Sequence, residues 1–255
     1  MYNDKKVSVV FATYKEKDSI RAVIENFFDT GFVDEIIVVN NNAEPGTVEE
    51  VQKTKARIVY EKRQGYGYTY QTGVKEASGD YVILCEPDGT YVGSDIERFL
   101  VYAKTGGFDV VLGSRTGLTK PMGGSMGFLR KYANVFEGKT IELLFNTNAL
   151  SDVGCTYKLF TRKAIDKFSP LWRTKGGLFA TELVLLTITE NLRFVEIPIT
   201  FKERVGVSIM VNSIRKLIKW GLLIYAFIFY SWFRWIFRKV FGNQLTKNHD
   251  QRPIR

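Results

Sequence analysis

Two carboxylates on either side of a proline have the spacing and the chemistry of a metal site. Glu86 and Asp88 directly follow the apolar run 81–85, and Pro87 lies between them. Carboxylate oxygens are the ligands that Mg²⁺ and Mn²⁺ prefer. Two neighbouring acids cost free energy unless they are solvated, paired or bound to a cation. The motif therefore predicts either a divalent-cation site or a solvated turn formed by Pro87 and Gly89.

The scarcity of other reactive side chains limits the chemistry of the chain. Its one histidine, His249, lies near the C-terminal end, and its two cysteines, Cys85 and Cys155, lack the spacing of a metal site. This excludes Ser-His-Asp, Cys-His and histidine–metal catalysis. Two isolated cysteines also fit a reduced, cytoplasmic setting. Catalysis must then use carboxylates, Lys or Arg, backbone groups and a hard metal ion.

The acid pair is expected at the end of a parallel strand. Apolar runs predict strands over 7–12, 35–39, 57–60, 81–85, 108–112 and 194–201, the last at a sheet edge because it contains Pro198. Predicted helices alternate with the first five strands. The first is capped by Asp18 or Ser19, the second starts at Thr47, the third is opened by Gly65 and Gly67, and the fourth starts with a capping box from Ser94 to Glu97. Such alternation predicts an α/β fold with an open parallel sheet, and ligands bind outside the carboxyl ends of its strands. We expect one domain over residues 1–210.

Two glycines mark a second candidate contact with a ligand. Gly65 and Gly67 open a predicted helix, where the backbone can approach a phosphate closely. A flexible loop explains them equally well. The sequence has neither a Walker motif nor a GxGxxG motif after its first strand, so a nucleotide would have to be held by carboxylates and a metal.

The strand-end motifs, taken together, resemble a known family. The motifs are Thr13-Tyr14-x-Glu16, Asn40-Asn41-Asn42, Gly65-x-Gly67, Glu86-Pro87-Asp88, Gly113-Ser114-Arg115 and Asp152-Val153-Gly154-Cys155. In order and spacing they resemble the family 2 glycosyltransferases, closest to the polyprenol-phosphate (dolichol-phosphate) mannosyl- and glucosyltransferase group. The resemblance extends over about residues 5–210. It implies the GT-A fold, an open and mostly parallel sheet flanked by helices, and an inverting sugar transferase.

The resemblance also implies roles on the donor side. Glu86 and Asp88 match the family's acidic motif, which holds Mg²⁺ or Mn²⁺ on the donor diphosphate; Glu86 stands where the family has an aspartate. The matching nucleotide-sugar-binding positions are Thr13, Tyr14, Glu16, Asn41, Gly65 and Gly67, together with the two acids.

On the acceptor side, the resemblance implies a phosphate site and a catalytic acid. The matching phosphate-binding positions are Arg115, Arg130, Asn134 and Arg204. Asp152 matches the acid proposed as the catalytic base, which a hydroxyl acceptor needs. A phosphate acceptor is already an anion, so Asp152 would then orient rather than deprotonate. From the residues alone, two alternatives stay open: Arg130 as the solvated start of a helix over 129–144, and Asp152 as a loop or helix cap.

The C-terminal fifth of the chain carries the whole net charge. Ten of the 36 Lys and Arg residues, but one of the 27 acids, lie in 204–255, so this segment holds the net charge of +9 and the remainder is neutral. A neutral body is not a nucleic-acid-binding surface. The partner of the basic segment is therefore expected to be an anionic membrane surface or another protein copy.

An apolar stretch within the basic segment supports the membrane interpretation. Residues 220–233 are 14 uncharged, largely aromatic and aliphatic residues with basic flanks and tryptophans at both ends. As a helix they would span about 21 Å, less than the ~30 Å of a bilayer core. We expect residues 211–241 to form a helix in the headgroup region on the cytoplasmic face, with 242–255 as a polar tail. A core helix or a homo-oligomer contact is the alternative.

Three functions fit these features. The first is metal-dependent transfer of a sugar from a nucleotide diphosphate sugar to a lipid-linked acceptor. The second is transfer to a saccharide hydroxyl in cell-surface polysaccharide synthesis, with Asp152 as base. The third is a degenerate, non-catalytic, membrane-bound partner.

Overall fold

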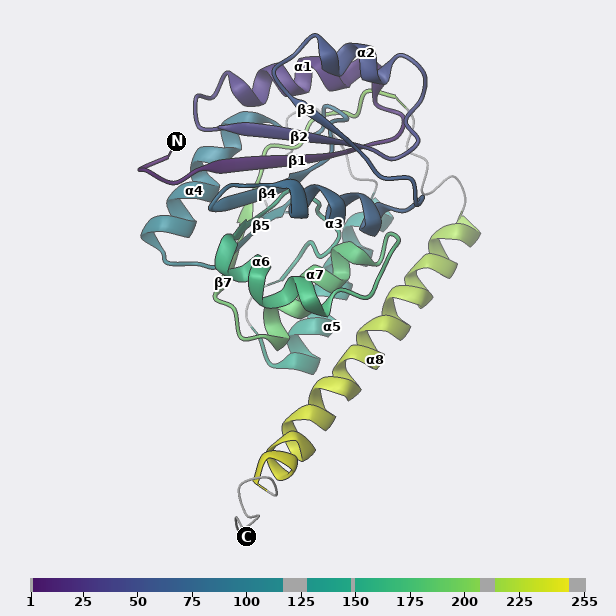
Figure 1. Cartoon of the computed structure of the whole chain (residues 1–255). Helices are drawn as coiled ribbons and strands as arrows, with labels where there is room; N and C mark the ends of the chain where they lie inside the picture. The colour runs from purple at the N-terminus through teal and green to yellow at the C-terminus, as the bar shows by residue number, and fades with distance from the viewer. Residues whose placement is uncertain (1, 117–127, 148–149, 207–213, 248–255) are drawn as a thin grey trace.

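The computed structural model describes residues 2–116, 128–147, 150–206 and 214–247, and its centre is a seven-stranded sheet (Figure 1). The strand order is β3-β2-β1-β4-β6-β5-β7. The strands are β1 (Val7–Thr13), β2 (Glu35–Asn40), β3 (Arg57–Tyr60), β4 (Tyr81–Cys85), β5 (Val110–Ser114), β6 (Lys158–Thr161) and β7 (Phe194–Pro198). All neighbours pair in parallel except β6, which is antiparallel to β4 and β5. The predicted α/β fold with a mostly parallel sheet is confirmed.

Helices cover both faces of this sheet. They are α1 (Lys17–Phe28), α2 (Thr47–Gln52), α3 (Tyr66–Glu76), α4 (Ile96–Thr105), α5 (Phe128–Phe145), α6 (Arg162–Phe168), α7 (Phe179–Thr189) and α8 (Ile214–Lys247), with short 3₁₀ turns η1 (Gly93–Asp95) and η2 (Ser169–Leu171). One apolar core joins the sheet to α1, α2 and α4. The other joins the opposite face to α3, α5, α6, α7 and α8, which contributes the buried Ile228 and several partly buried residues. Buried on both faces, β1, β2 and β4 are nearly continuous runs of apolar residues.

The first four predicted strands are confirmed, and β7 lies at the sheet edge, as Pro198 predicted. The sequence did not reveal β6. This strand has only four residues, and its first, Lys158, is a buried charge rather than an apolar residue. The strand predicted over 108–112 begins at Val110 instead.

Two predicted helix starts are wrong. Helix α1 begins at Lys17, so neither Asp18 nor Ser19 caps it; the Ser19 hydroxyl instead donates to the Pro87 carbonyl at 2.7 Å. The capping box from Ser94 to Glu97 does not form, because Ser94 lies inside η1 and the N-cap of α4 is Asp95, which makes no side-chain cap. The Asp95 carboxylate accepts from the Thr200 amide at 2.7 Å. Both side chains connect distant segments instead of capping a helix.

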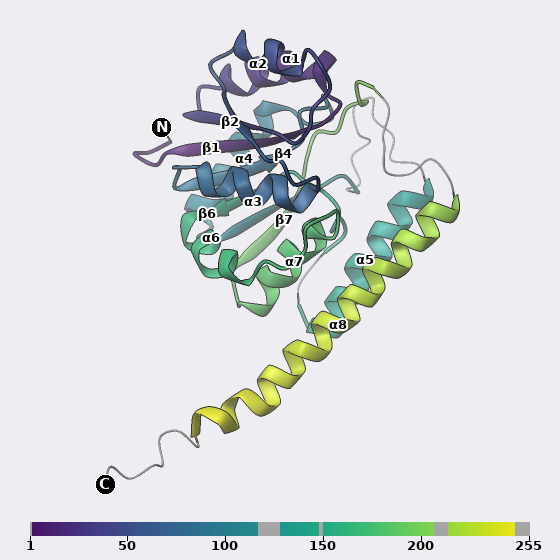
Figure 2. The same ribbon diagram turned by 45° about the vertical axis from the view of Figure 1, so that its right-hand side comes forward.

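The C-terminal helix is longer than the apolar stretch that predicted it. Helix α8 is continuous over 34 residues, so it includes the described part of the helix expected over 211–241 and extends to Lys247, into the predicted polar tail. Within the described residues, the 27-residue stretch from Arg215 to Phe241 is long and apolar enough to cross a membrane, by length and composition only. It lies beside α5 and α7 (Figure 2). The Trp232 indole donates to the Leu144 carbonyl at 2.6 Å, and so supplies a hydrogen-bond donor to a carbonyl in the last turn of α5 that has no partner within the helix.

Candidate functional site

The acid pair lies directly after β4, as predicted. Asp88 is 1% exposed, and its Oδ1 accepts from the Thr90 amide at 3.0 Å and the Thr90 hydroxyl at 2.6 Å. Gly89, between them, has a φ of +81°, which favours glycine. Glu86 Oε1 accepts from the Thr156 hydroxyl at 3.1 Å. The turn therefore buries the Asp88 carboxylate and half-buries that of Glu86, which contradicts a fully solvated turn.

A basic side chain from far along the chain neutralises part of this acidic cluster. Arg204 Nη1 lies 3.1 Å from Asp88 Oδ2, and its Nη2 lies 3.1 Å from Glu16 Oε1. The Val205 amide donates to the Asp88 carbonyl at 2.9 Å, which fixes the segment over the turn. Arg204, predicted at the acceptor phosphate, therefore lies against Asp88 and Glu16 in this structure, two residues predicted for the donor.

The acidic cluster has the character of a cation site. Burial, and next the negative charge of Asp88, raise the pKa of Glu86 to about 7. Among the described residues, no group of three His, Cys, Asp or Glu side chains is arranged to hold a metal. Two carboxylates can nevertheless hold Mg²⁺ or Mn²⁺ when phosphate oxygens of a substrate complete the coordination. Glu86 and Asp88 fit such a shared site.

The loop after β1 is organised by Glu16. Its carboxylate accepts from the Tyr14 amide at 2.7 Å, the Lys15 amide at 2.8 Å and the Thr13 hydroxyl at 3.2 Å. Tyr14 itself is 38% exposed, so its ring is accessible to a ligand. The structure thus brings Thr13, Tyr14 and Glu16 next to the acid pair through Arg204.

Asn41, after β2, uses its side chain to hold neighbouring loops. Its Nδ2 donates to the carbonyls of Glu61 at 2.7 Å and Arg63 at 2.9 Å, and its Oδ1 accepts from the Gly65 amide at 2.9 Å. Asn41 is 3% exposed. The amide group therefore positions the strand-end loops, and it has little capacity left for a ligand.

The two glycines that open α3 approach the backbone of another loop. The amides of Gly67 and Tyr68 both donate to the Lys175 carbonyl, at 3.0 and 3.2 Å. A Cβ at Gly67 would lie 2.7 Å from the Thr174 carbonyl oxygen. The backbone of residues 174–175 thus occupies the place predicted for a phosphate next to these glycines. The amides of Gly67 and Tyr68 are already hydrogen-bonded to it.

The acceptor-side residues meet around Asp152. Asp152 is 1% exposed and forms a two-pronged ion pair with Arg115, at 2.7 Å from Nε and 2.8 Å from Nη2. The Arg115 amide also donates to Asp152, at 2.8 Å, and Asn134 Nδ2 donates to it at 3.1 Å. Arg130 lies in α5, but its side chain is outside the described residues. The structure therefore brings together Arg115, Asn134 and Asp152.

Three charged side chains behind this cluster, of which Lys158 and Glu137 are buried and Glu196 is half-buried, were missed by the sequence analysis. Glu196, on β7, accepts from the amides of Ser151 and Asp152 and fixes the loop that carries the acid. Lys158 donates to the carbonyls of Val153 and Cys155. Glu137 lies on α5, and burial raises its pKa to about 7. No motif marks them, because buried charges become recognisable only when their partners from distant segments are known.

Comparison with known proteins places this arrangement in a family. The chain is 26% identical over 200 residues to the glycosyltransferase AglJ of Haloferax volcanii, and 24% identical over 237 residues to the dolichyl-phosphate beta-glucosyltransferase of Saccharomyces cerevisiae. These matches cover 78% and 82% of this chain, and 63% and 71% of the relatives; the chain thus spans less than two thirds of AglJ.

A solved structure has the same fold. The glucosyl-3-phosphoglycerate synthase of Mycobacterium tuberculosis, crystallised with Mn²⁺, uridine diphosphate and phosphoglyceric acid, superposes with a TM-score of 0.70 over 90% of this chain and 79% of that chain, at 16% identity. The sequence profile described as glycosyl transferase family 2 matches residues 8–168, which include β1 to β6 and both acid clusters. The match extends over more than half of the chain, and the chain therefore belongs to glycosyl transferase family 2.

Proposed function

We propose that this protein transfers a sugar, with inversion, from a nucleotide diphosphate sugar to a lipid-linked acceptor of the polyprenol phosphate type. Its family membership supports the reaction class. The yeast relative, named for a dolichyl-phosphate acceptor, supports the lipid phosphate. The mycobacterial neighbour, solved with Mn²⁺ and uridine diphosphate, supports a uridine-linked donor and a divalent metal.

On the donor side, Glu86 and Asp88 would hold Mg²⁺ or Mn²⁺. A bound cation supplies charge neutralisation for the departing diphosphate. Arg204 contributes a second positive charge at the same place, since it already contacts Asp88 and Glu16. Tyr14 and the loops held by Glu16 and Asn41 would line the nucleotide site.

The hydrogen bonding of Asp152 is the observation that favours a phosphate acceptor over a hydroxyl acceptor. Both of its carboxylate oxygens are bound to Arg115, and one also to Asn134. A general base must have an oxygen free to take a proton from the acceptor. A phosphate is already ionised near neutral pH and needs no base. Asp152 therefore acts by holding Arg115, whose guanidinium suits a phosphate.

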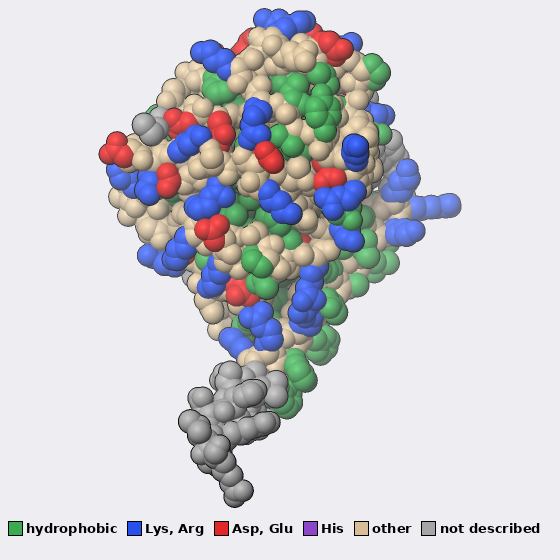
Figure 3. Space-filling view, viewed as in Figure 1, with side chains coloured by type: hydrophobic (Ala, Val, Ile, Leu, Met, Phe, Trp, Pro, Cys, Tyr) green, Lys and Arg blue, Asp and Glu red, His purple; other side chains and the backbone are tan. Residues whose placement is uncertain are grey.

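The acceptor would be met at a membrane. Helix α8 exposes large apolar residues along its length, with Lys and Arg side chains beside them (Figure 3). This pattern supports attachment of the protein to an anionic membrane surface on the cytoplasmic side, where nucleotide sugars are available.

The decisive experiment is an acceptor assay with the full chain. UDP- and GDP-sugars are supplied with Mn²⁺, and either a polyprenyl phosphate or an oligosaccharide is added. We expect a glycosylated polyprenyl phosphate and no product with the oligosaccharide. Transfer to the oligosaccharide that is abolished in D152N would instead assign Asp152 as a base. Neither transfer nor donor hydrolysis with any donor would indicate a non-catalytic partner.

A further inference from the structure

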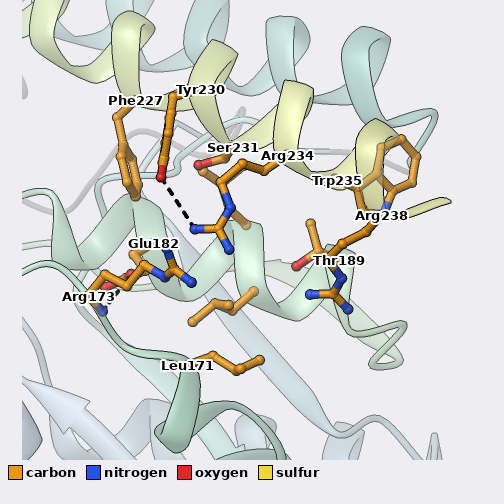
Figure 4. A pocket seen from close by; sticks show the side chains of 12 residues that line it. Leu171, Arg173, Glu182, Thr189, Phe227, Tyr230, Ser231, Arg234, Trp235 and Arg238 are labelled. Atoms are coloured by element: carbon orange, nitrogen blue, oxygen red, sulfur yellow. Dashed lines mark hydrogen bonds between the residues drawn. The ribbon is translucent and has the colours of Figure 1, made fainter. Parts of the chain in front are cut away.

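A groove between α7 and α8 contains basic side chains that the proposed reaction does not use. Arg173 precedes α7, and Arg234 and Arg238 lie one turn apart on α8. Their guanidinium groups point into the space between the two helices (Figure 4). The groove has a volume of about 600 Å³, which includes the part open to solvent.

The groove is positively charged because three arginines and one acid, Glu182, are among its lining residues. Glu182 accepts from the Arg173 and Thr174 amides, each at 2.9 Å, and from the Thr174 hydroxyl, so its carboxylate holds the loop. In the described part of the chain, no carboxylate forms an ion pair with Arg173 or with Arg234. Arg234 donates to the Tyr230 hydroxyl at 3.4 Å and lies over the ring of the same residue. Arg238 has an acidic partner, Glu190 at 3.1 Å.

The other walls of the groove are apolar. Leu171, Leu185 and Leu186 form one side, and Phe227 and Trp235 the other. The groove is continuous with α8, whose outward side exposes Phe229, Phe233 and Phe237 at 42%, 63% and 63%. An occupant must therefore combine an anionic group with apolar chains. Free phosphate satisfies the guanidinium groups but leaves the apolar walls in water.

We propose that this groove binds the phosphate of an anionic glycerophospholipid from the bilayer on which α8 lies. The headgroup phosphate would contact Arg234 and Arg238, with Arg173 facing them across the groove, and the acyl chains would follow the exposed apolar side of α8. Two arginines one helical turn apart match a phosphate with several acceptor oxygens. This inference rests on the proposed attachment of α8 to a membrane. It adds a defined lipid site, separate from the strand-end cluster.

A lipid that stays monomeric in solution tests the site without a membrane. Dihexanoyl phosphatidylglycerol, below its micelle concentration, is titrated into the full chain and followed by tryptophan fluorescence, since Trp235 lines the groove. We expect saturable binding that is at least tenfold weaker in R234Q/R238Q, because both charge-assisted contacts to the phosphate are lost. Glycerol 3-phosphate, which lacks acyl chains, should bind more weakly than the lipid.

Two further variants separate the groove from general charge effects. R215Q/K219Q removes the same charge from the start of α8 and should bind the monomeric lipid like the wild type. E190Q releases Arg238 from its partner and should bind about two- to fivefold more tightly. Unchanged circular dichroism and thermal unfolding establish that the variants are folded.

Several outcomes would overturn the proposal. They are the absence of saturable binding in the wild type, equal losses in the two double variants, or weaker binding in E190Q. Saturable binding of a short-chain polyprenyl phosphate without binding of the phosphatidylglycerol would assign the groove to the acceptor instead. Flotation with phosphatidylglycerol vesicles tests the membrane attachment separately: flotation without monomer binding refutes the groove alone, whereas failure to float refutes the attachment.

Discussion

Four charged side chains around the β4 turn form the most unusual local arrangement in this molecule. Asp88 and Glu16 are buried acids, Glu86 is a half-buried one, and Arg204 is the basic side chain that bridges Asp88 and Glu16. The charge of one arginine cannot balance three ionised carboxylates. Accordingly, the pKa of Glu86 rises to about 7 through burial and through Asp88. A divalent cation would remove this imbalance, and it would compete with Arg204 for Asp88.

Substituting Asp88→Asn is expected to abolish stabilisation by the metal. In the wild type, Mn²⁺ added to the uridine diphosphate complex should raise the unfolding temperature, because a ligand at 100 times its Kd stabilises by about 2.7 kcal/mol. D88N keeps the shape but loses the charge, so the Mn²⁺-dependent increment should vanish in differential scanning fluorimetry. D166N, at an exposed acid on α6, should keep it. An undiminished increment in D88N would refute the site.

Glu137 makes the stability of the fold depend on pH. Burial raises its folded-state pKa to about 7, above the usual value of 4.5. The carboxyl group is therefore most stabilising when protonated: its contribution is complete below pH 4.5 and is lost as the pH rises through 7. We expect E137Q, which retains a hydrogen-bonding partner for Thr181, to be more stable than the wild type at pH 8 by roughly 2–3 kcal/mol. Urea unfolding at pH 5 and pH 8 measures this, and an equal difference at both pH values would contradict it.

The sequence predicts which residues are present at the site but not how they pair. Asp152 and Arg115 are both identifiable from their motifs, yet their two-pronged ion pair connects positions 37 residues apart. Arg204 is 188 residues from Glu16. Such pairings depend on how the sheet is ordered, and no local pattern determines that order. Glu196 escaped notice for the same reason.

At the scale of elements, the start of α3 depends on a second loop. Residues 173–175 are fixed by Glu182 on one side and accept the amides of Gly67 and Tyr68 on the other. Gly65 and Gly67 are thus explained by the close packing of their backbone against that of residues 174–175. A phosphate-binding loop and such a contact require the same residues, so sequence alone leaves the two indistinguishable.

Gly67→Ala should destabilise the protein, whereas Gly176→Ala should not. The new Cβ at position 67 would lie 2.7 Å from a backbone oxygen, whereas no atom lies within 4 Å of one at position 176. Alanine improves helix propensity by up to ~1 kcal/mol, but overpacking against backbone costs about 1–3 kcal/mol. We therefore expect a net loss of about 1–2 kcal/mol for G67A in denaturant unfolding, and less than about 0.5 kcal/mol for G176A. Equal stabilities would contradict the contact.

The other helices and strands could be predicted where their apolar residues recur with a regular period. Strands β1, β2 and β4 and the amphipathic helix α1 have long, regular apolar patterns, and they form where expected. The capping box at Ser94 failed because a tertiary contact, Asp95 with Thr200, outweighed a local hydrogen bond. Strand β6 is antiparallel and only four residues long, too short for its period to be recognised.

On the scale of the whole molecule, α8 is both part of the core and a surface helix. Ile228 is fully buried in the core that includes α5 and α7, while Leu222 is 67% exposed. A boundary at residue 210 between a catalytic domain and a membrane helix, as proposed from the sequence, would separate Ile228 from the core that it completes. The charge of +9 predicted the surface role, but only the fold reveals the packing.

The two roles can be separated by two alanine substitutions on α8. Ile228→Ala should lower the free energy of unfolding by about 2–4 kcal/mol, because it leaves a cavity in the core. Leu222→Ala should change it by less than about 0.5 kcal/mol in the absence of vesicles. Urea unfolding of the two variants measures this. If I228A is no less stable than L222A, α8 does not pack on the body in solution.

The alignment of α5 with α8 has an electrostatic consequence. Phe136 contacts Tyr225, and Phe145 contacts Trp235, so the two helices run parallel (Figure 2). Each helix carries a macrodipole equivalent to about half a positive charge at its N-terminus, and in a parallel pair these partial charges add at one end. That arrangement repels itself, and side-chain packing must offset it. The molecule therefore presents about one unit of positive partial charge, fixed in the backbone and independent of pH, at the end of the pair where α5 begins at Phe128 and α8 at Ile214.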